Sequence, residues 1–460
     1  MAQVSRELLT KYATNAPRYT SYPTAVDWSK EFEGSAYPEL LAQAATRSGP
    51  LSVYVHLPFC AELCLFCGCN MVVSRNVSRI DDYLDCLEIE FETVGKSGVG
   101  SRVVRQYHWG GGTPTQLNLE QIERVQRAFS RWFRFSSDAE VGLEVDPRVT
   151  TREQIRLLAQ LGFNRISLGV QDFDPQVQQA IKRVQSEAET RAVVDAAREY
   201  GMGSVNIDLI YGLPHQNEAG FERTVERVLA IRPERVALFH YAHVPWMKGH
   251  QEAMDASAMP SSELKLSIFL RAIEQFRGAG YEYIGLDHFA LPSDEMAIAH
   301  REHSLGRNFM GYTTKRGDDM LSLGVSSIGD VSGCFVQNSP KELEYKALVR
   351  ERGFATHRGH RLTPEDQLRR DVILALMCNG RIDKGAVEAR HGIAFDPYFA
   401  RELSELIPLE DDGLVRCESG ALVVTELGQL FLRNVALPFD RYYAARKAAG
   451  GGAQTFSRTV

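Results

Sequence analysis

The feature that most constrains the fold of this chain is a repeated alternation of strand-like and helix-like segments. Six apolar runs are separated by segments with helical spacing, such as residues 151–162 and 189–201. The runs cover residues 51–58, 105–112, 141–147, 165–173, 204–214 and 235–242. Because strands joined by helical crossovers pair in parallel, six such units in about 200 residues predict an α/β fold, as an open or complete barrel.

Polar and glycine residues recur where these predicted strands end. They are His56 and Cys60, residues 110–113, Glu144 and Asp146, Gln171, Asp208 and Tyr211, and residues 240–243. In a parallel barrel the carboxyl ends of the strands form one face, so we expect a common pocket there. Any one of these residues taken singly is equally compatible with an ordinary turn at the end of a strand.

The rest of the chain predicts attachments on both sides of the barrel. Residues 281–292 and 320–331 are strand-like, residues 362–380 are helical, and residues 420–437 resemble a short strand that leads into a helix. We therefore expect an N-terminal extension over 1–48, a catalytic barrel over 49–345 and a mainly helical C-terminal domain over 346–460.

Composition and charge exclude several classes of protein. The 460 residues are 44% hydrophobic and carry a formal net charge of −7, which disfavours a general nucleic-acid binder. No stretch approaches the roughly 18 apolar residues of a membrane span, and no secretory signal is visible near Met1. We expect a cytoplasmic protein with no membrane insertion and no nucleic-acid partner.

Four of the eight cysteines lie within residues 56–70, at Cys60, Cys64, Cys67 and Cys69. Structural zinc sites usually divide four ligands between two separated pairs, whereas three close thiolates on one loop suit a 4Fe-4S cluster with one open iron. The spacing favours the cluster and leaves zinc, redox thiols and chance as alternatives. The other cysteines are Cys86, Cys334, Cys378 and Cys417, and we expect each to be a small buried apolar residue.

A C-x3-C-x2-C loop after the first barrel strand, with GGGTPT at 110–115, resembles the radical S-adenosylmethionine (SAM) superfamily. Further stretches resemble the oxygen-independent coproporphyrinogen III oxidase family within it. They are PRYTSYPT, YVHLPFC, CGCN, HWGGGTPT, EVDPR, GVQDF, NIDLIYGLP and YAHVP, in that order along nearly the whole chain. The resemblance implies a partial (β/α)6-type radical SAM barrel with an N-terminal extension and a mainly helical C-terminal domain.

The resemblance also implies roles for individual residues. Cys60, Cys64 and Cys67 match the three ligands of one 4Fe-4S cluster, and Cys69 matches an additional cysteine that is not a ligand. Glu144 matches a residue that fixes the first SAM molecule. The other positions that match residues around two SAM molecules are Tyr54, Phe66, Gly111, Gly112, Thr113, Gln171, Arg183, Asp208, Ala242 and Ile328. No catalytic residue beyond these is assigned.

The implied reaction is the conversion of two propionate side chains of coproporphyrinogen III into vinyl groups, which gives protoporphyrinogen IX. A 5'-deoxyadenosyl radical would take a hydrogen atom from each propionate, and a low-potential electron donor would supply the electron that generates it. The family also suggests a monomer. Arg18, Tyr19 and Tyr22 are candidates for a flap over the pocket, with a surface-packed extended segment as the alternative.

Two other functions are compatible with parts of the sequence. One is a heme chaperone related to this enzyme, but such relatives typically lack the C-x-C cysteine, PRYTSYPT and this C-terminal domain, all of which this chain has. The other is a zinc-stabilised interaction protein, which the spacing of the cysteines on a single loop disfavours.

Overall fold

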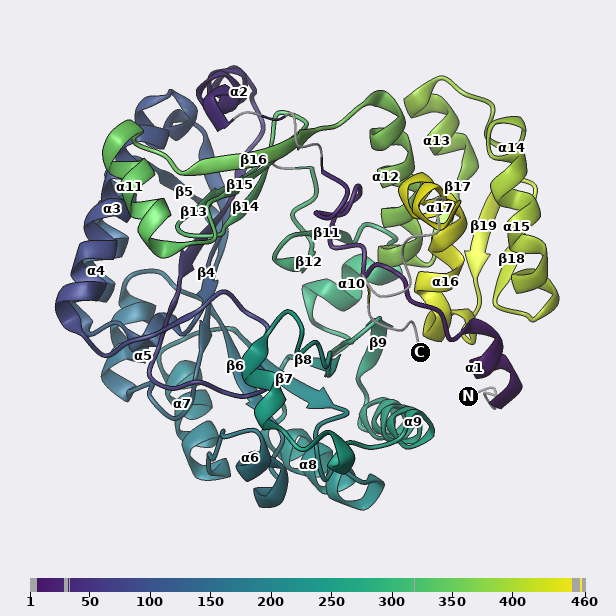
Figure 1. The fold of residues 1–460 in the computed structure, drawn as a ribbon, viewed down its shortest axis with the longest axis horizontal. Coiled ribbons are helices and arrows are strands. Elements are labelled where there is room, and N and C mark those ends of the chain that lie inside the picture. The colour runs from purple at the N-terminus through teal and green to yellow at the C-terminus, as the bar shows by residue number, and fades with distance from the viewer. Residues whose placement is uncertain (1–5, 29–31, 33, 318, 449–455, 457–460) are drawn as a thin grey trace.

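The computed structural model describes residues 6–28, 32, 34–317, 319–448 and 456. Its centre is a curved sheet, which has twelve hydrogen-bonded strands within the described residues. Figure 1 shows helices around the outer side of this sheet and the C-terminal helices beside its open side. The predicted α/β architecture is confirmed.

Seven neighbouring strands of the sheet run parallel. In sheet order they are β13 (Asp319–Leu323), β1 (Leu51–Leu57), β4 (Val103–Gly111), β5 (Arg134–Val145), β6 (Arg165–Gln171), β7 (Ser204–Tyr211) and β8 (Arg235–His240). All six predicted runs form strands of this set. Strand β1 is buried along almost its whole length, as expected for a parallel strand covered on both faces.

Antiparallel strands extend the sheet at both ends. They are β14 (Ile328–Val331), β15 (Cys334–Asn338) and β16 (Thr356–Arg361) beyond β13, and β10 (His288–Ala290) and β9 (Glu282–Gly285) beyond β8. The runs 281–292 and 320–331 each give two strands rather than one. Leu286 and Ser326 adopt positive φ angles of 49° and 59°, and these left-handed residues turn the chain between the paired strands.

The outer helices are α3 (Val77–Lys96), α4 (Leu119–Ser130), α5 (Arg152–Gln160), α6 (Pro175–Ala180), α7 (Glu187–Glu199), α8 (Glu218–Ile231), α9 (Ser262–Gly278) and α11 (Glu342–Arg352). Local sequence defines where several of them begin. The side chains of Asn118, Thr151 and Ser186 cap α4, α5 and α7 in reciprocal capping boxes. Such a cap contributes about 1 kcal/mol, so the helix starts are encoded locally.

A hairpin and a short helix lie between the barrel and the C-terminal helices, namely β11 (Gly306–Asn308), β12 (Gly311–Thr313) and α10 (Glu295–Arg301). The hairpin is tied to strand β4. The amide nitrogen of Gln106 donates to Thr313 Oγ1 at 3.2 Å, and Asn308 donates to Gln106 Oε1 at 3.3 Å. These contacts hold the hairpin against the sheet.

The C-terminal region has a hydrophobic core of its own. It contains α12 (Pro364–Asn379), α13 (Lys384–His391), α14 (Phe395–Tyr398), α15 (Ala400–Asp411), α16 (Leu432–Ala436) and α17 (Arg441–Ala448), with a small sheet of β17 (Arg381–Asp383), β19 (Ala421–Val424) and β18 (Val415–Cys417). The predicted helix over 362–380 corresponds to α12, and the predicted strand and helix over 420–437 correspond to β19 and α16. The domain boundaries at 48/49 and 345/346 stay a proposal.

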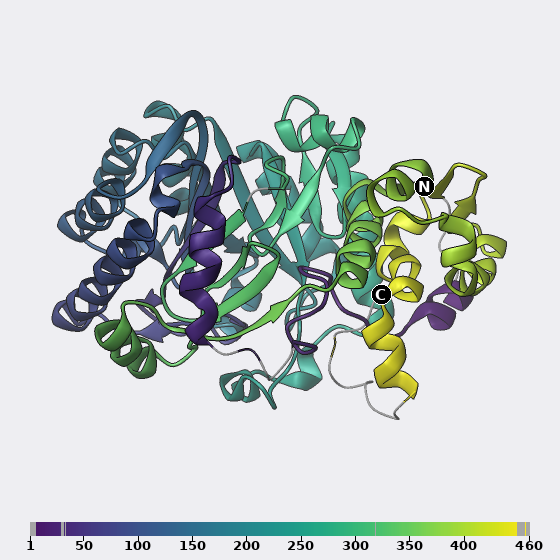
Figure 2. The same ribbon diagram turned by 90° about the horizontal axis from the view of Figure 1, so that it is seen from above.

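The N-terminal segment contacts both parts of the molecule. Helix α1 (Arg6–Tyr12) lies beside the C-terminal helices, and α2 (Tyr37–Ala45) lies against the sheet (Figures 1 and 2). Tyr19 and Tyr22 of PRYTSYPT are buried in the C-terminal core. Tyr19 donates to Asp440 Oδ2 at 3.1 Å, and the Arg441 amide donates to the Tyr22 hydroxyl at 3.2 Å. These two tyrosines therefore anchor the segment.

One expectation about the scattered cysteines is wrong. Cys86, Cys334 and Cys378 are buried as predicted, but Cys417 is exposed. Strand β18 is an edge strand of the small sheet, and the backbone amide of Cys417 donates to Glu410 Oε1 at 2.7 Å. Cys417 ends this short strand, in which Val415 is buried and Arg416 is exposed, and sequence periodicity over three residues could not reveal the exposure of Cys417.

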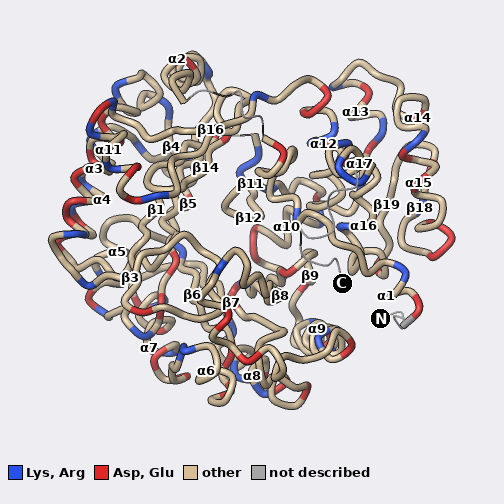
Figure 3. Tube along the Cα trace, in the orientation of Figure 1, with Lys and Arg blue, Asp and Glu red and all other residues tan. Residues whose placement is uncertain are grey.

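Acidic and basic residues alternate along the chain of the outer helices (Figure 3). Opposite charges interspersed in this way favour solubility without a single-sign field. Within the described part of the chain, no helix is both long enough and apolar enough to cross a bilayer.

Candidate active site

The cysteine loop follows β1 at the carboxyl end of the parallel strands. It is held at its two ends by a short parallel pairing of β2 (Phe59–Cys60) with β3 (Val72–Val73). Because this pairing closes residues 61–71 into a compact loop, the cysteine thiols lie near one another. The pKa of Cys60 rises to about 11, first through burial and also through the nearby Cys67 and Cys64 thiols.

His56 ties the cysteine loop to the barrel. Its Nε2 lies 2.8 Å from the Asn70 carbonyl, and its Nδ1 lies 3.1 Å from the Tyr54 hydroxyl. A carbonyl can only accept, so Nε2 carries the proton and Nδ1 accepts from Tyr54. Burial lowers the pKa of His56, which favours this neutral form. Both ring nitrogens are satisfied, and they link β1 to the end of the loop.

Three side chains surround the thiols. Thr113 Oγ1 lies 3.6 Å from Cys60 Sγ, while Arg148 and Arg183 each place a guanidinium nitrogen 3.5 Å from Cys64 Sγ. Two guanidinium groups therefore place positive charge beside the Cys64 sulfur. Among the described residues, no group of three or more His, Cys, Asp or Glu side chains converges closely enough to hold a metal ion.

The glycine turn after β4 passes close to the cysteine loop. The Gly112 amide donates to Leu57 O at 2.9 Å, and the Thr113 amide donates to Phe59 O at 2.8 Å. A Cβ atom at Gly112 would lie 2.4 Å from Pro58 O, and one at Gly111 would lie 2.5 Å from the His56 ring. Only glycine allows this approach of two backbones, which explains the residue type at both positions.

Glu144, near the end of β5, faces the glycine turn. Its Oε2 accepts from the Gly111 amide at 3.1 Å, and its Oε1 lies 3.9 Å from His108 Nε2. Burial alone would raise the pKa of Glu144, but His108 and the Gly111 amide hold it below its ordinary value. The side chain is therefore an ionised acceptor at neutral pH, suited to an ammonium or hydroxyl group.

Asp208, on β7, is in a different electrostatic state. Burial, followed by the charge of Glu144, raises its pKa to about 7. Its oxygens accept from Asn206 Nδ2 at 2.7 Å and from Ser167 Oγ at 3.2 Å. Two carboxyl groups with pKa values pushed apart face the same interior, as often found at functional sites.

Arg183 joins three parts of the site. It donates to Asp146 Oδ2 at 3.0 Å and to Gly169 O at 2.5 Å, in addition to its contact with Cys64. Its buried Nε has no hydrogen-bond partner among the described residues, and an unpaired donor of this kind is an opening for an anionic group. Gln171, also buried, adopts a positive φ of 69° at the end of β6.

The remaining predicted residues lie in three places. Tyr54 stacks on His108 with ring centroids 6.3 Å apart, inside the barrel. Phe66 packs against a cluster that includes Leu65 and Ile210. Ile328 begins β14 and packs against the group of Trp28, Phe335 and Leu362, while Ala242 follows β8. The structure thus places the predicted residues at the strand ends and along the adjoining edge of the sheet.

A cavity of about 850 Å³, here called the strand-end cavity, lies beside this site. Its lining includes Arg18, Tyr211, His240, Ala242, Lys265 and Arg433, which come from the N-terminal segment, β7, β8, the loop after β8, α9 and α16. Ala242 is the predicted cofactor residue among them. The cavity therefore joins the strand ends to the C-terminal region.

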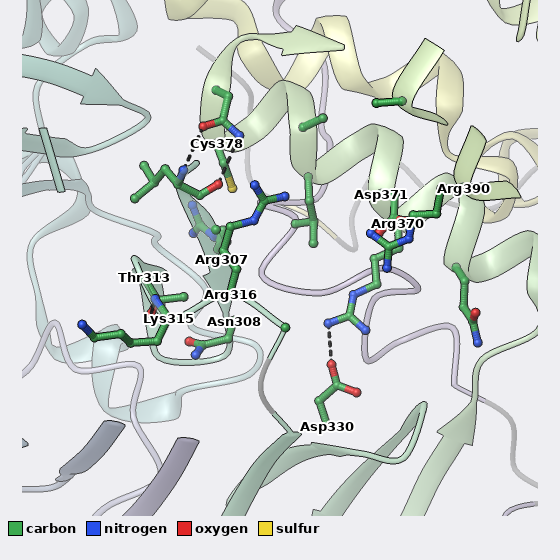
Figure 4. Close-up of a pocket in the computed structure, with 18 of the residues that line it drawn as sticks. Arg307, Asn308, Thr313, Lys315, Arg316, Asp330, Arg370, Asp371, Cys378 and Arg390 are labelled. Carbon is green, nitrogen blue, oxygen red and sulfur yellow. Dashed lines mark hydrogen bonds and ion pairs between the residues drawn. The ribbon is translucent and has the colours of Figure 1, made fainter. Parts of the chain in front are cut away.

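A second cavity of about 800 Å³, here called the ion-paired cavity, lies between the hairpin β11–β12, β13, β14 and the helices α12 and α13. Its lining includes Arg47, Arg307, Asp319, Asp330, Arg370 and Asp371. Figure 4 shows the pairing of Arg370 from α12 with Asp330 from β14.

Two polar residues of the site had no predicted role. His108 pairs with Glu144, and Arg148 donates to Asp146 at 2.7 Å and to Cys64. Their signal in the sequence was their position, because His108 directly precedes WGGGT and Arg148 ends EVDPR. A hydrogen-bonding partner on a neighbouring strand or loop cannot be identified from such a signal alone.

Comparison with known proteins agrees with this geometry. Residues 54–228 match the model of the radical SAM superfamily, and residues 362–431 match that of the HemN C-terminal domain. These matches confirm the predicted radical SAM barrel. Enzymes of this superfamily carry a 4Fe-4S cluster and SAM.

Full-length relatives are also similar. The oxygen-independent coproporphyrinogen III oxidases of Salmonella typhimurium and Escherichia coli are each 44% identical over 453 residues, which cover 98% of both chains. The Synechocystis enzyme of that name is 42% identical over 464 residues, covering 100% of this chain and 98% of its own.

A solved structure, the coproporphyrinogen III oxidase HemN from Escherichia coli, described as a radical SAM enzyme, superposes with a TM-score of 0.90 at 42% identity. It covers 96% of this chain and 100% of its own. The alignment takes in the barrel, the N-terminal segment and the C-terminal helices together. This chain therefore belongs to the oxygen-independent coproporphyrinogen III oxidase family of the radical SAM superfamily.

Proposed function

We propose that this chain catalyses the oxygen-independent oxidative decarboxylation of two propionate side chains of coproporphyrinogen III, giving protoporphyrinogen IX. The observation that carries this proposal is the cysteine loop, the glycine turn and Glu144 at one strand-end face beside a cavity of about 850 Å³. A cavity of this size falls in the range of specific small-molecule sites. The related heme chaperone is not favoured.

Cys60, Cys64 and Cys67 would hold the 4Fe-4S cluster, because soft thiolates on one loop suit iron and leave one iron open. Cys69 stays outside the ligand set in this proposal. The donors of the site fit SAM as well, since ionised Glu144 offers an acceptor and the unpaired Arg183 Nε offers a donor.

The full set of residues proposed to line two SAM molecules is Tyr54, Phe66, Gly111, Gly112, Thr113, Glu144, Gln171, Arg183, Asp208, Ala242 and Ile328. When bound, the cluster and SAM supply the radical that takes a hydrogen atom from a propionate side chain. The chain's own part is to bind, orient and shield. The His56 contacts fix the loop against β1, and the Gly111 amide orients the Glu144 carboxylate.

Each propionate loses one hydrogen atom, one further electron and carbon dioxide to become a vinyl group. We propose a low-potential electron donor, a monomeric state and a cytoplasmic location as the working conditions of the enzyme. These rest on the family resemblance and on the sequence, and the final electron acceptor is left open.

The test is turnover without oxygen. Reconstituted protein given a strong reductant, SAM and coproporphyrinogen III should form protoporphyrinogen IX together with methionine. Glu144→Ala should retain iron and sulfide but form at least 100-fold less methionine, because orientation of SAM is lost. Fully loaded protein that bound heme and consumed no coproporphyrinogen, even with an artificial electron acceptor, would overturn the proposal in favour of the chaperone.

A further inference from the structure

We infer that the strand-end cavity recognises the carboxylates of its substrate through three cationic side chains, Arg18, Lys265 and Arg433. The inference rests on the proposed function, whose substrate carries four propionates. It gives the N-terminal segment and the C-terminal helices a direct role in choosing the substrate.

The three cations come from distant parts of the sequence and meet around His240, at the end of β8. Lys265 and His240 both lie beside Gly212. A Cβ atom added to Gly212 would lie 3.3 Å from Lys265 Cε and 3.5 Å from His240 Cδ2. Burial and then the charges of Lys265, Arg18 and Arg433 lower the pKa of His240 to about 3. All three cationic side chains line the same cavity as His240, so they share one space.

The cavity carries more positive than negative side chains. Among the described residues that line it, Asp287 is the acidic one, and it pairs with Arg18. Burial and then the charge of Arg18 lower the pKa of Arg433 to about 9, while burial and then the charge of Arg307 lower the pKa of Arg18 to about 10. An anionic ligand would relieve this repulsion, which is the electrostatic complementarity that a carboxylate offers.

Arg433 is held in place by the N-terminal segment. Its Nε donates to Pro17 O at 3.1 Å, and Nη2 donates to Ala16 O, while only 5% of the residue is exposed. Backbone carbonyls orient the guanidinium without neutralising its charge. The N-terminal segment thus positions one cation and contributes another, Arg18, from the next residue.

The walls of the same cavity are apolar and aromatic. Tyr211 and Phe269 stack with ring centroids 5.1 Å apart, and Tyr283 and Leu432 also face the space. Trp246 and Met247 line it with 68% and 69% of their surface exposed. Apolar walls with a few placed cations match a macrocycle with an apolar face and an anionic rim.

The experiment measures equilibrium binding to the reconstituted enzyme, without reductant, at pH 8. The probe is coproporphyrin III, the oxidised porphyrin with the same four propionates, and the comparison ligand is its tetramethyl ester. Lys265→Gln and Arg433→Gln should each weaken binding of the free acid on the order of ten-fold, because a charge-assisted hydrogen bond is lost. Neither substitution should change binding of the ester.

Arg390→Gln serves as the matched control, because Arg390 lines the ion-paired cavity instead. It should bind the free acid as the parent enzyme does. In turnover, Lys265→Gln should raise KM for coproporphyrinogen III about ten-fold while kcat changes less than two-fold. Should Arg433→Gln fail to fold, Lys265→Gln alone decides, since Lys265 is only half-buried on α9.

Parental affinity for the free acid in Lys265→Gln and in folded Arg433→Gln would overturn the inference, and so would a loss confined to Arg390→Gln. If the parent enzyme turns over coproporphyrinogen III while both variants bind the free acid as tightly as the parent, this inference alone is refuted. If the variants bind coproporphyrin III more weakly but the parent enzyme never decarboxylates the substrate, the proposed function alone is refuted.

Discussion

The two cavities differ little in volume, about 850 against about 800 Å³, but they differ in how their charges are compensated. In the ion-paired cavity Arg47 pairs with Asp319 at 2.7 Å, Arg370 pairs with Asp330, and Arg390 pairs with Asp371 at 3.1 Å. In the strand-end cavity three cations share one lining acid, Asp287. Size alone does not distinguish a binding site from a structural cavity, so the ion pairs between lining residues have to be compared as well.

Not every cation of the ion-paired cavity forms an ion pair, and Arg307 is an example. Its Nε and Nη1 are buried without a hydrogen-bond partner among the described residues. Its guanidinium lies 4.9 Å from the centroid of the Tyr312 ring, so a cation–π contact compensates part of the cost of burial. The contrast between the cavities therefore lies in the three ion pairs of the ion-paired cavity, because the linings of both cavities hold more cationic than acidic side chains.

The substitutions with the largest expected effect test whether substrate binding and cluster binding are separable. Cys60→Ser, Cys64→Ser and Cys67→Ser should each lose bound iron and sulfide and abolish turnover, because a hydroxyl replaces a soft thiolate. Binding of coproporphyrin III should persist, since none of these cysteines lines the strand-end cavity within the described residues.

Cys69→Ser is the control for this series and should keep full iron and sulfide. The measurements are iron and labile sulfide per chain, together with probe titration. Full iron in any of the first three variants, or iron loss in the fourth, would contradict the proposed ligand set.

The next prediction, of smaller effect, is that substitutions in the two cavities change the free energy of unfolding of the protein by different amounts. Arg370→Gln removes the partner of Asp330, whose side chain is only 16% exposed, and should lower the free energy of unfolding by about 2 kcal/mol. Lys265→Gln should leave that free energy nearly unchanged and weaken only binding. Urea unfolding of both variants measures the difference.

Arg401→Gln provides a surface control, because its pair with Glu405 is exposed and should contribute less than about 1 kcal/mol. If Arg370→Gln weakened coproporphyrin III binding as much as Lys265→Gln does, the ion-paired cavity would no longer count as structural.

The smallest expected effect concerns pH. KM for coproporphyrinogen III should stay within two-fold between pH 6 and pH 8, because a His240 with a pKa of about 3 gains its proton only well below this range. Burial and the Lys265 charge also lower the pKa of His243, and burial raises that of Tyr211 to about 12 and that of Tyr283 further. The positive charge facing the ligand thus comes from Arg18, Lys265 and Arg433, with Asp287 as the acidic group.

His240→Gln should show the same flat profile. A fall in KM of more than two-fold on going from pH 8 to pH 6, absent in His240→Gln, would show that His240 becomes a fourth cation of the strand-end cavity.

Much of the fold could be predicted from local pattern. The six strand-like runs, the cysteine spacing and the glycine turn are contiguous in sequence, and capping residues such as Asn118 and Ser186 define helix starts through neighbours three residues away. The splitting of 281–292 and 320–331 was missed, because left-handed backbone at Leu286 and Ser326 carries no strong signal in these residue types.

The sequence by itself determined the β/α order, the loop of three closely spaced thiols and the membership of the family, because each is written in short runs of adjacent residues. Only the tertiary structure brought Arg18, Lys265 and Arg433 around His240, paired His108 with Glu144, and left Cys417 exposed. These arrangements join positions tens to hundreds of residues apart or, for Cys417, depend on where a short strand ends. Their physical cause is the packing of strands, helices and terminal segments against one another, which no local periodicity encodes.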